Sequence, residues 1–377
     1  MIRGGDPGHI ATTRTRSDPL GPALSVGGRH RAPRWFVAGV VVSILAGACS
    51  SPTAAHSTVA QGSRGNGSVR AAVASPGCSS PAGAAVTEQN EEITVDGVAR
   101  SYLLSTPPPR SGAGPRPLVV DLHGLGEGAS LEADTTQFSP FAQAHGFIVV
   151  FPQGSGSPVG WDIAPGTSAH PNHDIDFMNA LLSSLEAHQC VDESRLYATG
   201  LSDGALFTSL LACTMANRFA AFAPVAGAVL DKPCDPGRRV SIVAFHGTAD
   251  PILYFNGGVG TAVLNNAFSG KTTPTTPLPP VNLDGKGYPA NVKAWAAKDG
   301  CDLRAIDTHV STHVILRTYK CPPGAAVEFY IVVGGGHAWP GSKFSAALKA
   351  ITGPSTFEIN ATDIIWKFFQ QHPLGRS

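Results

Sequence analysis

The sequence predicts a mainly parallel β-sheet that is covered by helices on both faces. Short apolar runs such as 118–122 and 147–151 alternate with helical patterns such as 175–188. Strands that alternate with helices favour parallel pairing, because each helix carries the chain back to the edge where the next strand begins. Eight apolar runs of strand type can be counted along the chain, so we expect a sheet of eight strands.

The first two strands, 92–95 and 98–104, flank Asp96-Gly97, a dipeptide that is typical of a tight β-hairpin turn. The other six strands are expected at 118–122, 147–151, 195–199, 219–226, 241–245 and 327–333. Helices are expected at 135–144, 175–188, 205–217, 291–298 and 361–371. Segment 251–289 interrupts this alternation with many Gly, Pro, Thr and Asn residues, and we interpret it as an insertion.

The composition excludes two classes of protein. Hydrophobic residues make up 42% of the 377 residues, which is too many for a disordered chain. Lys plus Arg and Asp plus Glu both number 27, so the formal net charge is zero. A protein that binds nucleic acid through bulk electrostatics needs a basic face, and we therefore expect no nucleic-acid partner.

The first fifty residues indicate export. Arg29, Arg31 and Arg34 precede the apolar run 35–48, whose 14 residues are too few to span a membrane and typical of a signal peptide. The run ends at Cys49 in a sequence that resembles a bacterial lipobox. We expect a lipoprotein-type signal peptide over 1–48 and a lipid on Cys49 that anchors the exported protein to the cell membrane. Ordinary secretion into the extracellular space, and a cytosolic protein with a buried apolar start, are the alternatives.

Residues 49–88 are rich in Ser, Ala and Gly and are expected to form a flexible tether. The remaining residues, 89–377, are expected to form one catalytic domain that includes the insertion. We expect it to work as a monomer.

Seven cysteines leave six once Cys49 is set aside. An exported protein can oxidise them, and six cysteines allow 15 pairings. Proximity in the sequence favours Cys213–Cys234 and Cys301–Cys321, which leaves Cys78–Cys190. Buried free thiols are the alternative.

We expect no metal and no organic cofactor. The sequence contains no Cys-x-x-Cys, so a thiolate zinc site is not indicated. His170, His173, Asp174 and Asp176 are metal-ligating residue types in one segment, but we interpret them as solvated loop residues, with Asp174 capping the helix that follows.

The strongest chemical signal is Gly200-Leu201-Ser202-Asp203-Gly204, the GxSxG pattern of a nucleophilic serine. It lies where strand 195–199 ends and helix 205–217 begins, which is the context that the motif requires. Glycine on both sides lets the strand and the helix approach without a Cβ clash. The alternative is a serine that merely starts a helix.

A nucleophilic serine needs a base and an acid that orients the base. Asp250 follows strand 241–245, and His337 follows strand 327–333. Carboxyl ends of parallel strands share one edge of a sheet, so Ser202, Asp250 and His337 are expected to meet there as nucleophile, acid and base. His246, just before a glycine, is interpreted as structural.

Acyl transfer also needs donors for the oxyanion of the tetrahedral intermediate. We expect the backbone N–H of Asp203, which follows the serine, and the N–H of Leu125, in the glycine-rich turn after strand 118–122. Trp161, Trp339 and the insertion are expected to line the substrate pocket, although packing explains Trp339 equally well.

Longer motifs carry a family resemblance. They are GLSDG at 200–204, His246-Gly247-Thr248-Ala249-Asp250, and Gly334-Gly335-Gly336-His337-Ala338-Trp339-Pro340-Gly341. Together they resemble the polyhydroxybutyrate depolymerase/feruloyl esterase family of α/β-hydrolases over about residues 90–371. The resemblance implies an α/β-hydrolase fold, Ser202 as nucleophile, Asp250 as acid and His337 as base.

The expected activity is hydrolysis of carboxylic esters through an acyl-enzyme. Feruloyl, acetyl, short-chain and hydroxyalkanoate esters, as small molecules or oligomers, are the expected substrates. Two alternatives stay open: a serine peptidase related to prolyl oligopeptidase, and a non-catalytic surface lipoprotein that keeps the fold.

Overall fold

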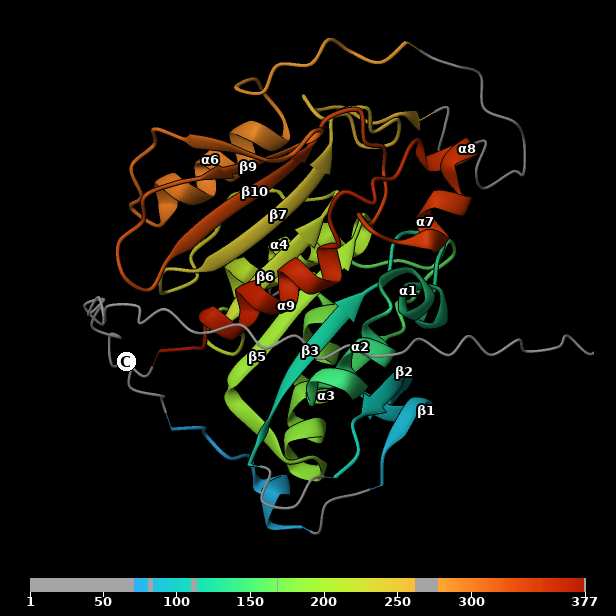
Figure 1. Cartoon of the computed structure of the whole chain (residues 1–377). Helices are drawn as coiled ribbons and strands as arrows, with labels where there is room; N and C mark the ends of the chain where they lie inside the picture. Colours follow the sequence, from blue (N-terminus) through green and yellow to red (C-terminus); the bar gives the residue numbers. More distant parts are fainter. Residues whose placement is uncertain (1–70, 81–83, 110–113, 168, 262–276, 376–377) are drawn as a thin grey trace, which may run out of the picture. The chain divides into compact units, whose positions relative to one another are not determined.

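The structure is a computed structural model, and it describes residues 71–80, 84–109, 114–167, 169–261 and 277–375 (Figure 1). The expected signal peptide, Cys49 and the tether up to residue 70 lie outside these residues, as do residues 262–276 of the expected insertion. Within the described ranges, no helix has both the length and the apolar character needed to cross a membrane.

The described strands form one sheet in the order β1-β2-β4-β3-β5-β6-β7-β10-β9-β8. They are β1 (Val86–Val95), β2 (Val98–Thr106), β3 (Arg116–Leu122), β4 (Ile148–Pro152), β5 (Val191–Leu201), β6 (Ala221–Val225), β7 (Ser241–Gly247), β8 (Ile306–Ser311), β9 (Val314–Thr318) and β10 (Ala326–Val332). The six strands from β4 to β10 in this order pair in parallel, and the strands at both ends of the sheet pair antiparallel.

The expected sheet of eight strands is wrong in number, because the described sheet has ten. The two additional strands are β8 and β9, which form an antiparallel hairpin at one edge. The side chains of Ile306 to Val310 are all exposed, so this edge strand carries no apolar run that would distinguish it from a loop in the sequence. The fold class itself is confirmed, since the parallel centre with its crossovers is that of an α/β-hydrolase.

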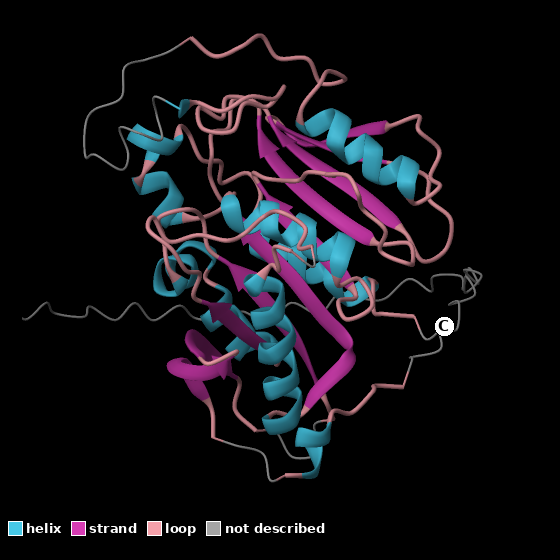
Figure 2. Ribbon diagram, turned by 180° about the vertical axis from the view of Figure 1, so that it is seen from behind, coloured by secondary structure: helices cyan, strands magenta, loops and turns pink. Residues whose placement is uncertain are grey.

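Two layers of helices cover the sheet. They are α1 (Ala129–Thr136), α2 (Phe138–His145), α3 (His173–His188), α4 (Asp203–Thr214), α6 (Tyr288–Lys298), α7 (Lys343–Ala347), α8 (Lys349–Thr352) and α9 (Ala361–Gln371). One core cluster contains apolar residues of α3, α4 and α6, and the other contains those of α1, α2 and α9. In Figure 1, α9 crosses in front of the sheet. Figure 2 shows the molecule from the opposite side.

Successive side chains of a central strand point to opposite faces of the sheet, so each strand contributes to the core under both helix layers. In β3, the side chains of Leu118 and Val120 belong to one core cluster, whereas Val119 between them belongs to the other. Each of these side chains is fully buried. A strand that is covered on both faces therefore appears as a continuous apolar run in the sequence.

The helix expected over 135–144 is two shorter helices in the structure. Between α1 and α2 stands Gln137, whose φ of 56° lies in the left-handed region. A non-glycine residue seldom adopts this conformation, and no local pattern in the sequence signals it. The helix expected over 361–371 has the same bounds as α9.

Residues 71–80, which the sequence analysis placed in a flexible tether, are attached to the domain. The amide of Val73 donates to the carboxylate of Asp192 at 2.9 Å, and the hydroxyl of Ser75 donates to the carbonyl of Gln189 at 2.8 Å. A Cβ on Gly77 would lie 2.4 Å from that same carbonyl oxygen, so only glycine fits this approach. Contacts with the domain therefore already begin at Val73, before the expected boundary at residue 89.

The described residues contain three disulfides: the two pairs that proximity in the sequence favoured, and the pair that these two left over. Cys78–Cys190 joins the N-terminal segment to the start of β5, across 112 residues of sequence. Cys213–Cys234 fastens the end of α4, and Cys301–Cys321 fastens the start of the β8–β9 hairpin to the segment that follows it.

Candidate active site

Ser202 stands alone between β5 and α4 in a strained turn. Its φ of 59° and ψ of −118° lie outside the conformations that a side chain with a Cβ normally adopts. The turn is held by the amide of Ser202, which donates to the carbonyl of Val225 at 3.0 Å on the neighbouring strand. The serine is half-buried, at the carboxyl edge of the sheet and the N-terminus of a 12-residue helix.

The glycines that flank Ser202 are required by sterics. A Cβ on Gly200 would lie 2.5 Å from the carbonyl oxygen of Leu122, and one on Gly204 would lie only 1.9 Å from the same oxygen. The end of β3 therefore passes directly over the turn. This close approach brings the loop that follows β3 next to the serine.

Asp250 and His337 form a buried hydrogen-bonded pair. Nδ1 of His337 donates to Oδ2 of Asp250 at 2.7 Å, and both side chains are almost completely buried. The other carboxylate oxygen accepts the amides of Ile252 and Leu253, each at 2.8 Å. The acid is thus fixed at both oxygens, and it lies in the loop after β7, as the sequence analysis expected.

The two groups shift each other's proton affinity in opposite directions. Burial alone would raise the pKa of Asp250, but the nearby His337 and the hydrogen bonds outweigh it, so this pKa is lowered. Burial alone would lower the pKa of His337, but the charge of Asp250 and the hydrogen bond outweigh it, so this pKa is raised. The arrangement favours a charged acid beside a histidine that accepts a proton readily.

Nε2 of His337 is the atom that would accept a proton from the serine. Among the described residues it is buried and has no hydrogen-bond partner. The ring orientation is settled by Nδ1, which is committed to Asp250. In the neutral ring, the proton is therefore on Nδ1 and Nε2 is free to act as an acceptor.

His246 packs beneath the acid, in agreement with a structural interpretation. Its ring stacks on Tyr288 with centroids 3.7 Å apart, and Nε2 lies 2.8 Å from the carbonyl of Leu253. The same nitrogen is 3.3 Å from Oδ2 of Asp250. Burial lowers the pKa of His246 to about 4, so this ring is neutral at physiological pH.

The two amides expected to bind an oxyanion are both without an acceptor among the described residues. Asp203 is the first residue of α4, where helical amides have no partner within the helix. Leu125 lies in the loop after β3, and its neighbours Gly124, Gly126 and Glu127 all use their own amides in hydrogen bonds. The side chain of Leu125 is 38% exposed, which leaves this part of the loop open to a ligand.

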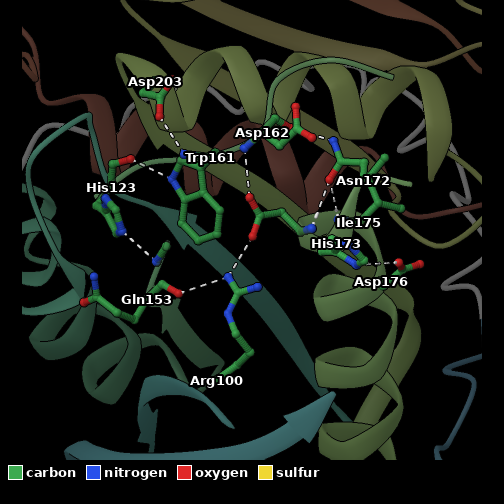
Figure 3. A network of polar contacts seen from close by, with 12 residues as sticks. Arg100, His123, Gln153, Trp161, Asp162, Asn172, His173, Ile175, Asp176 and Asp203 are labelled. Carbon is green, nitrogen blue, oxygen red and sulfur yellow. Dashed lines mark hydrogen bonds and ion pairs between the residues drawn. The ribbon is translucent and has the colours of Figure 1, made fainter. Parts of the chain in front are cut away.

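Trp161 supports the site from behind and does not line a pocket. It is 7% exposed, and its ring stacks on Phe207 with centroids 5.2 Å apart. Its indole N–H donates to the carbonyl of His123 at 2.9 Å, and its amide donates to the carboxylate of Asp203 at 2.8 Å (Figure 3). The expectation that Trp161 binds substrate is not supported, because its polar and flat surfaces are both occupied by the protein.

Trp339 is also packed in the protein. It is 1% exposed, and its indole N–H donates to the hydroxyl of Thr362 at 3.0 Å. It borders a cavity of about 670 Å³ between α1, α7 and α9, but neither Ser202 nor His337 lines that cavity. Of the two interpretations that the sequence left open, the structure favours packing.

Of the four residues interpreted as a solvated loop, His173, Asp174 and Asp176 lie in the first turn of α3. Asp174 is buried and pairs with Arg100 at 2.7 Å. The side chain of Asn172 accepts the amide of Ile175 (Figure 3) and caps α3 in the place expected for Asp174. His173 and Asp176 are exposed and lie near Asp96, with candidate ligand atoms within 4.8 Å of one another. Exposed groups at this spacing do not by themselves make a metal site.

A buried pair of acids was missed by the sequence analysis. Asp121 at the end of β3 and Glu132 in α1 are both fully buried. The hydroxyl of Thr136 donates to Asp121 at 2.7 Å. Burial raises the pKa of Asp121 to about 7, and burial together with the charge of Asp121 raises that of Glu132 well above its usual value. Nothing in the sequence around these residues indicates that they meet.

Comparison with known proteins gives a consistent assignment. Residues 100–263 match the family model described as esterase PHB depolymerase. "Putative esterase NocK" of Nocardia uniformis subsp. tsuyamanensis is 28% identical over 293 residues, which are 74% of this chain and 81% of that protein. Feruloyl esterase B of Piromyces equi is 28% identical over 246 residues, which are 63% of this chain and 42% of that protein.

Among solved structures, an acetyl xylan esterase from Aspergillus awamori has a TM-score of 0.49 at 15% sequence identity, over 75% of this chain and 99% of that one. The strand order and the residues at the carboxyl edge of the sheet define the class as an α/β-hydrolase. Within this class, residues 100–263 are similar to the family described as esterase PHB depolymerase. That stretch includes Ser202 and Asp250 and ends before His337.

Proposed function

We propose that this protein is a serine esterase that hydrolyses carboxylic esters through an acyl-enzyme. The observation that carries the proposal is the convergence of three groups on one edge of the sheet. These are Ser202 in its strained turn after β5, Asp250 after β7 and His337 after β10, with Nδ1 of the histidine bonded to the acid. Hydrolysis by a serine nucleophile requires a base that takes the proton of the serine and an acid that orients the base, and these three groups meet that requirement.

In the first step, Nε2 of His337 takes the hydroxyl proton of Ser202 while Oγ bonds to the ester carbonyl carbon. The carbonyl oxygen becomes an oxyanion, which the amides of Asp203 and Leu125 bind. When the intermediate collapses, the C–O bond to the alcohol breaks and His337 returns its proton to the leaving oxygen. Water then attacks the acyl-enzyme with the same proton transfers, and this releases the carboxylic acid and restores Ser202.

The proposed substrates are feruloyl, acetyl, short-chain or hydroxyalkanoate esters, as small molecules or oligomers. Support comes from the names of the relatives, which include a feruloyl esterase and a bifunctional acetylxylan esterase/xylanase. The mechanism uses no metal and no organic cofactor, and a monomer contains every residue that it requires.

We propose further that the protein is exported and held at the cell membrane by a lipid on Cys49. The apolar run before Cys49 and the three disulfides support this location, since disulfides persist in oxidising compartments. Incorporation of a labelled fatty acid, lost in Cys49→Ala, is the expected result. A wild-type protein that is exported without the label would refute lipid anchoring and favour ordinary secretion.

The esterase proposal is tested by labelling and by hydrolysis. The wild-type protein is expected to react covalently with a fluorophosphonate and to hydrolyse p-nitrophenyl butyrate. Ser202→Ala should lose both activities, whereas Ser183→Ala, at an exposed serine of α3, should keep them. A side-by-side panel of feruloyl, acetyl and 3-hydroxybutyrate esters with a peptide library then assigns the substrate class. Full hydrolysis by Ser202→Ala would refute the assignment, and an inert wild-type serine would favour a non-catalytic protein.

A further inference from the structure

The loop after β3 holds one peptide group unusually firmly. The carbonyl oxygen of Gly124 accepts two hydrogen bonds, one from Nδ1 of His123 at 2.8 Å and one from the amide of Glu127 at 3.2 Å. The amide of Gly124 donates to the carboxylate of Glu127 at 2.9 Å. The amide of Gly126 donates to Val159 at 2.6 Å. Of the amides of residues 124–127, that of Leu125 alone has no acceptor in the part of the chain that the structure describes.

The direction of the histidine bond follows from its second nitrogen. Nε2 of His123 lies 2.9 Å from the amide of Gly154, and an amide can only donate. Nε2 must therefore be the unprotonated nitrogen, and Nδ1 carries the proton that is donated to the carbonyl of Gly124. The ring is fully buried, and burial lowers its pKa, so this neutral tautomer persists at neutral pH.

The carbonyl of Gly124 and the amide of Leu125 belong to the same peptide group. Because this group is planar and trans, its N–H points in the direction opposite to its C=O. A donor that fixes the carbonyl therefore fixes the direction of the N–H as well. This step rests on the proposed function, in which the N–H of Leu125 binds the oxyanion.

We infer that His123 is a positioning residue, which aims the amide of Leu125 at the oxyanion by holding the carbonyl of Gly124. It does not itself touch the substrate. An N–H that is aimed before the reaction binds the oxyanion without reorganisation, and this is the origin of its catalytic effect.

The surroundings of His123 fit this role. A Cβ on Gly154 would lie 3.0 Å from Nε2 and 2.5 Å from the carbonyl oxygen of Gly160, so glycine is needed for the close approach. The carbonyl of His123 accepts the indole N–H of Trp161, whose amide donates to the carboxylate of Asp203 (Figure 3). Trp161 thus links the residue that contributes one oxyanion amide to the loop that contributes the other.

The test compares two substitutions of His123, each of which keeps a polar group at the position of one ring nitrogen. The side-chain amide of His123→Asn can replace the Nδ1 donor, whereas that of His123→Gln reaches the position of Nε2 and leaves the carbonyl of Gly124 without this donor. We expect kcat for p-nitrophenyl butyrate to fall about 100-fold in His123→Gln, within the range for loss of an oxyanion donor. The fall in His123→Asn should be less than about tenfold, with KM nearly unchanged in both.

A second measurement distinguishes a lost orientation of the Leu125 amide from a general disturbance of the site. A trifluoromethyl ketone, which forms a tetrahedral adduct with the serine, should bind His123→Gln more weakly in proportion to the fall in kcat/KM. Equal kcat in the Asn and Gln variants, or a change in KM alone, would overturn the inference. If the wild-type protein neither reacts with a fluorophosphonate nor cleaves esters, it is the proposed function that fails.

Trp161→Phe keeps the test decisive if neither variant of His123 folds. This substitution removes the indole bond to the carbonyl of His123 and retains an aromatic ring over Phe207. We expect kcat to fall severalfold at constant KM, with normal far-UV circular dichroism. An unchanged kcat would overturn the inference.

Discussion

Asp250→Asn is the most informative single change, because the protein dictates which way the new amide must turn. In the native protein, one carboxylate oxygen accepts the amides of Ile252 and Leu253, each at 2.8 Å, and the other accepts Nδ1 of His337 at 2.7 Å. Two backbone donors can be satisfied only by the oxygen of the asparagine. Its NH2 group must then face His337.

An NH2 group can only donate, so Nδ1 of His337 would have to become the acceptor. The ring proton then moves to Nε2, the atom that should take the proton of Ser202. We expect kcat to fall about 10³- to 10⁴-fold, as is typical when the base is held in the wrong tautomer. At about 1.4 kcal/mol per factor of ten, this is about 4–5.5 kcal/mol of transition-state stabilisation.

The pH profile gives the same prediction a second test. The neutral imidazole is the active form, so activity is present above the pKa of His337 and is lost as the pH falls through it. In the native protein the charge of Asp250 raises this pKa. Removing that charge should therefore move the acidic limb of the residual activity to lower pH.

The assay is hydrolysis of p-nitrophenyl butyrate as a function of pH, with thermal unfolding to establish that the variant is folded. Asp231→Asn, at an exposed aspartate, is the matched control and should behave as the wild type does. A variant Asp250→Asn that retains a tenth or more of the native kcat (about 1.4 kcal/mol) would refute the argument. An acidic limb that moves to higher pH would also refute it.

Three further outcomes follow from packing and covalent structure. Burial raises the pKa of Asp121 to about 7 and raises that of Glu132 well above its usual value, so the native state binds more protons than the unfolded chain. Stability should therefore fall as the pH rises from about 4 through the raised pKa of Asp121, and Glu132→Gln should raise Tm above that pH and flatten the dependence. Gly204→Ala places a Cβ 1.9 Å from the carbonyl oxygen of Leu122, and it should cost more than about 3 kcal/mol in urea unfolding and abolish fluorophosphonate labelling. Cys78→Ser opens a loop of 112 residues, and calorimetry should show a loss of roughly 4 kcal/mol; an unchanged Tm would contradict this.

The parts of the fold that could be predicted are those with a local pattern. The central strands are continuous apolar runs because helices cover them on both faces, and GxSxG stands where a strand meets a helix. Asp250 and His337 could be found because each follows such a strand. The β8–β9 hairpin lacked this signal, since β8 points its side chains to solvent.

The contacts that support the site could not be predicted, because their partners are far apart in the sequence. Nε2 of His123 meets the amide of Gly154, 31 residues away, and the carboxylate of Asp203 meets Trp161, 42 residues away. Asp121 lies within the apolar run of β3, and Glu132 lies in the short polar helix α1, so no local pattern indicates that the two acids meet. The pattern of apolar residues along a sequence predicts which face of a strand or helix is buried. It does not predict which polar groups of different elements come into contact.

The N-terminal segment has a mechanical consequence. It joins the domain through Cys78 to Cys190, one residue before β5, whereas Ser202 comes one residue after β5. Fully extended at about 3.3 Å per residue, the 11 residues of β5 would span roughly 35 Å, and the irregular pairing with β3 between Val191 and Leu196 shortens this distance. A pull on the chain at residue 71 therefore acts on the end of β5 that lies opposite Ser202, and not on the edge of the sheet where Ser202, Asp250 and His337 lie.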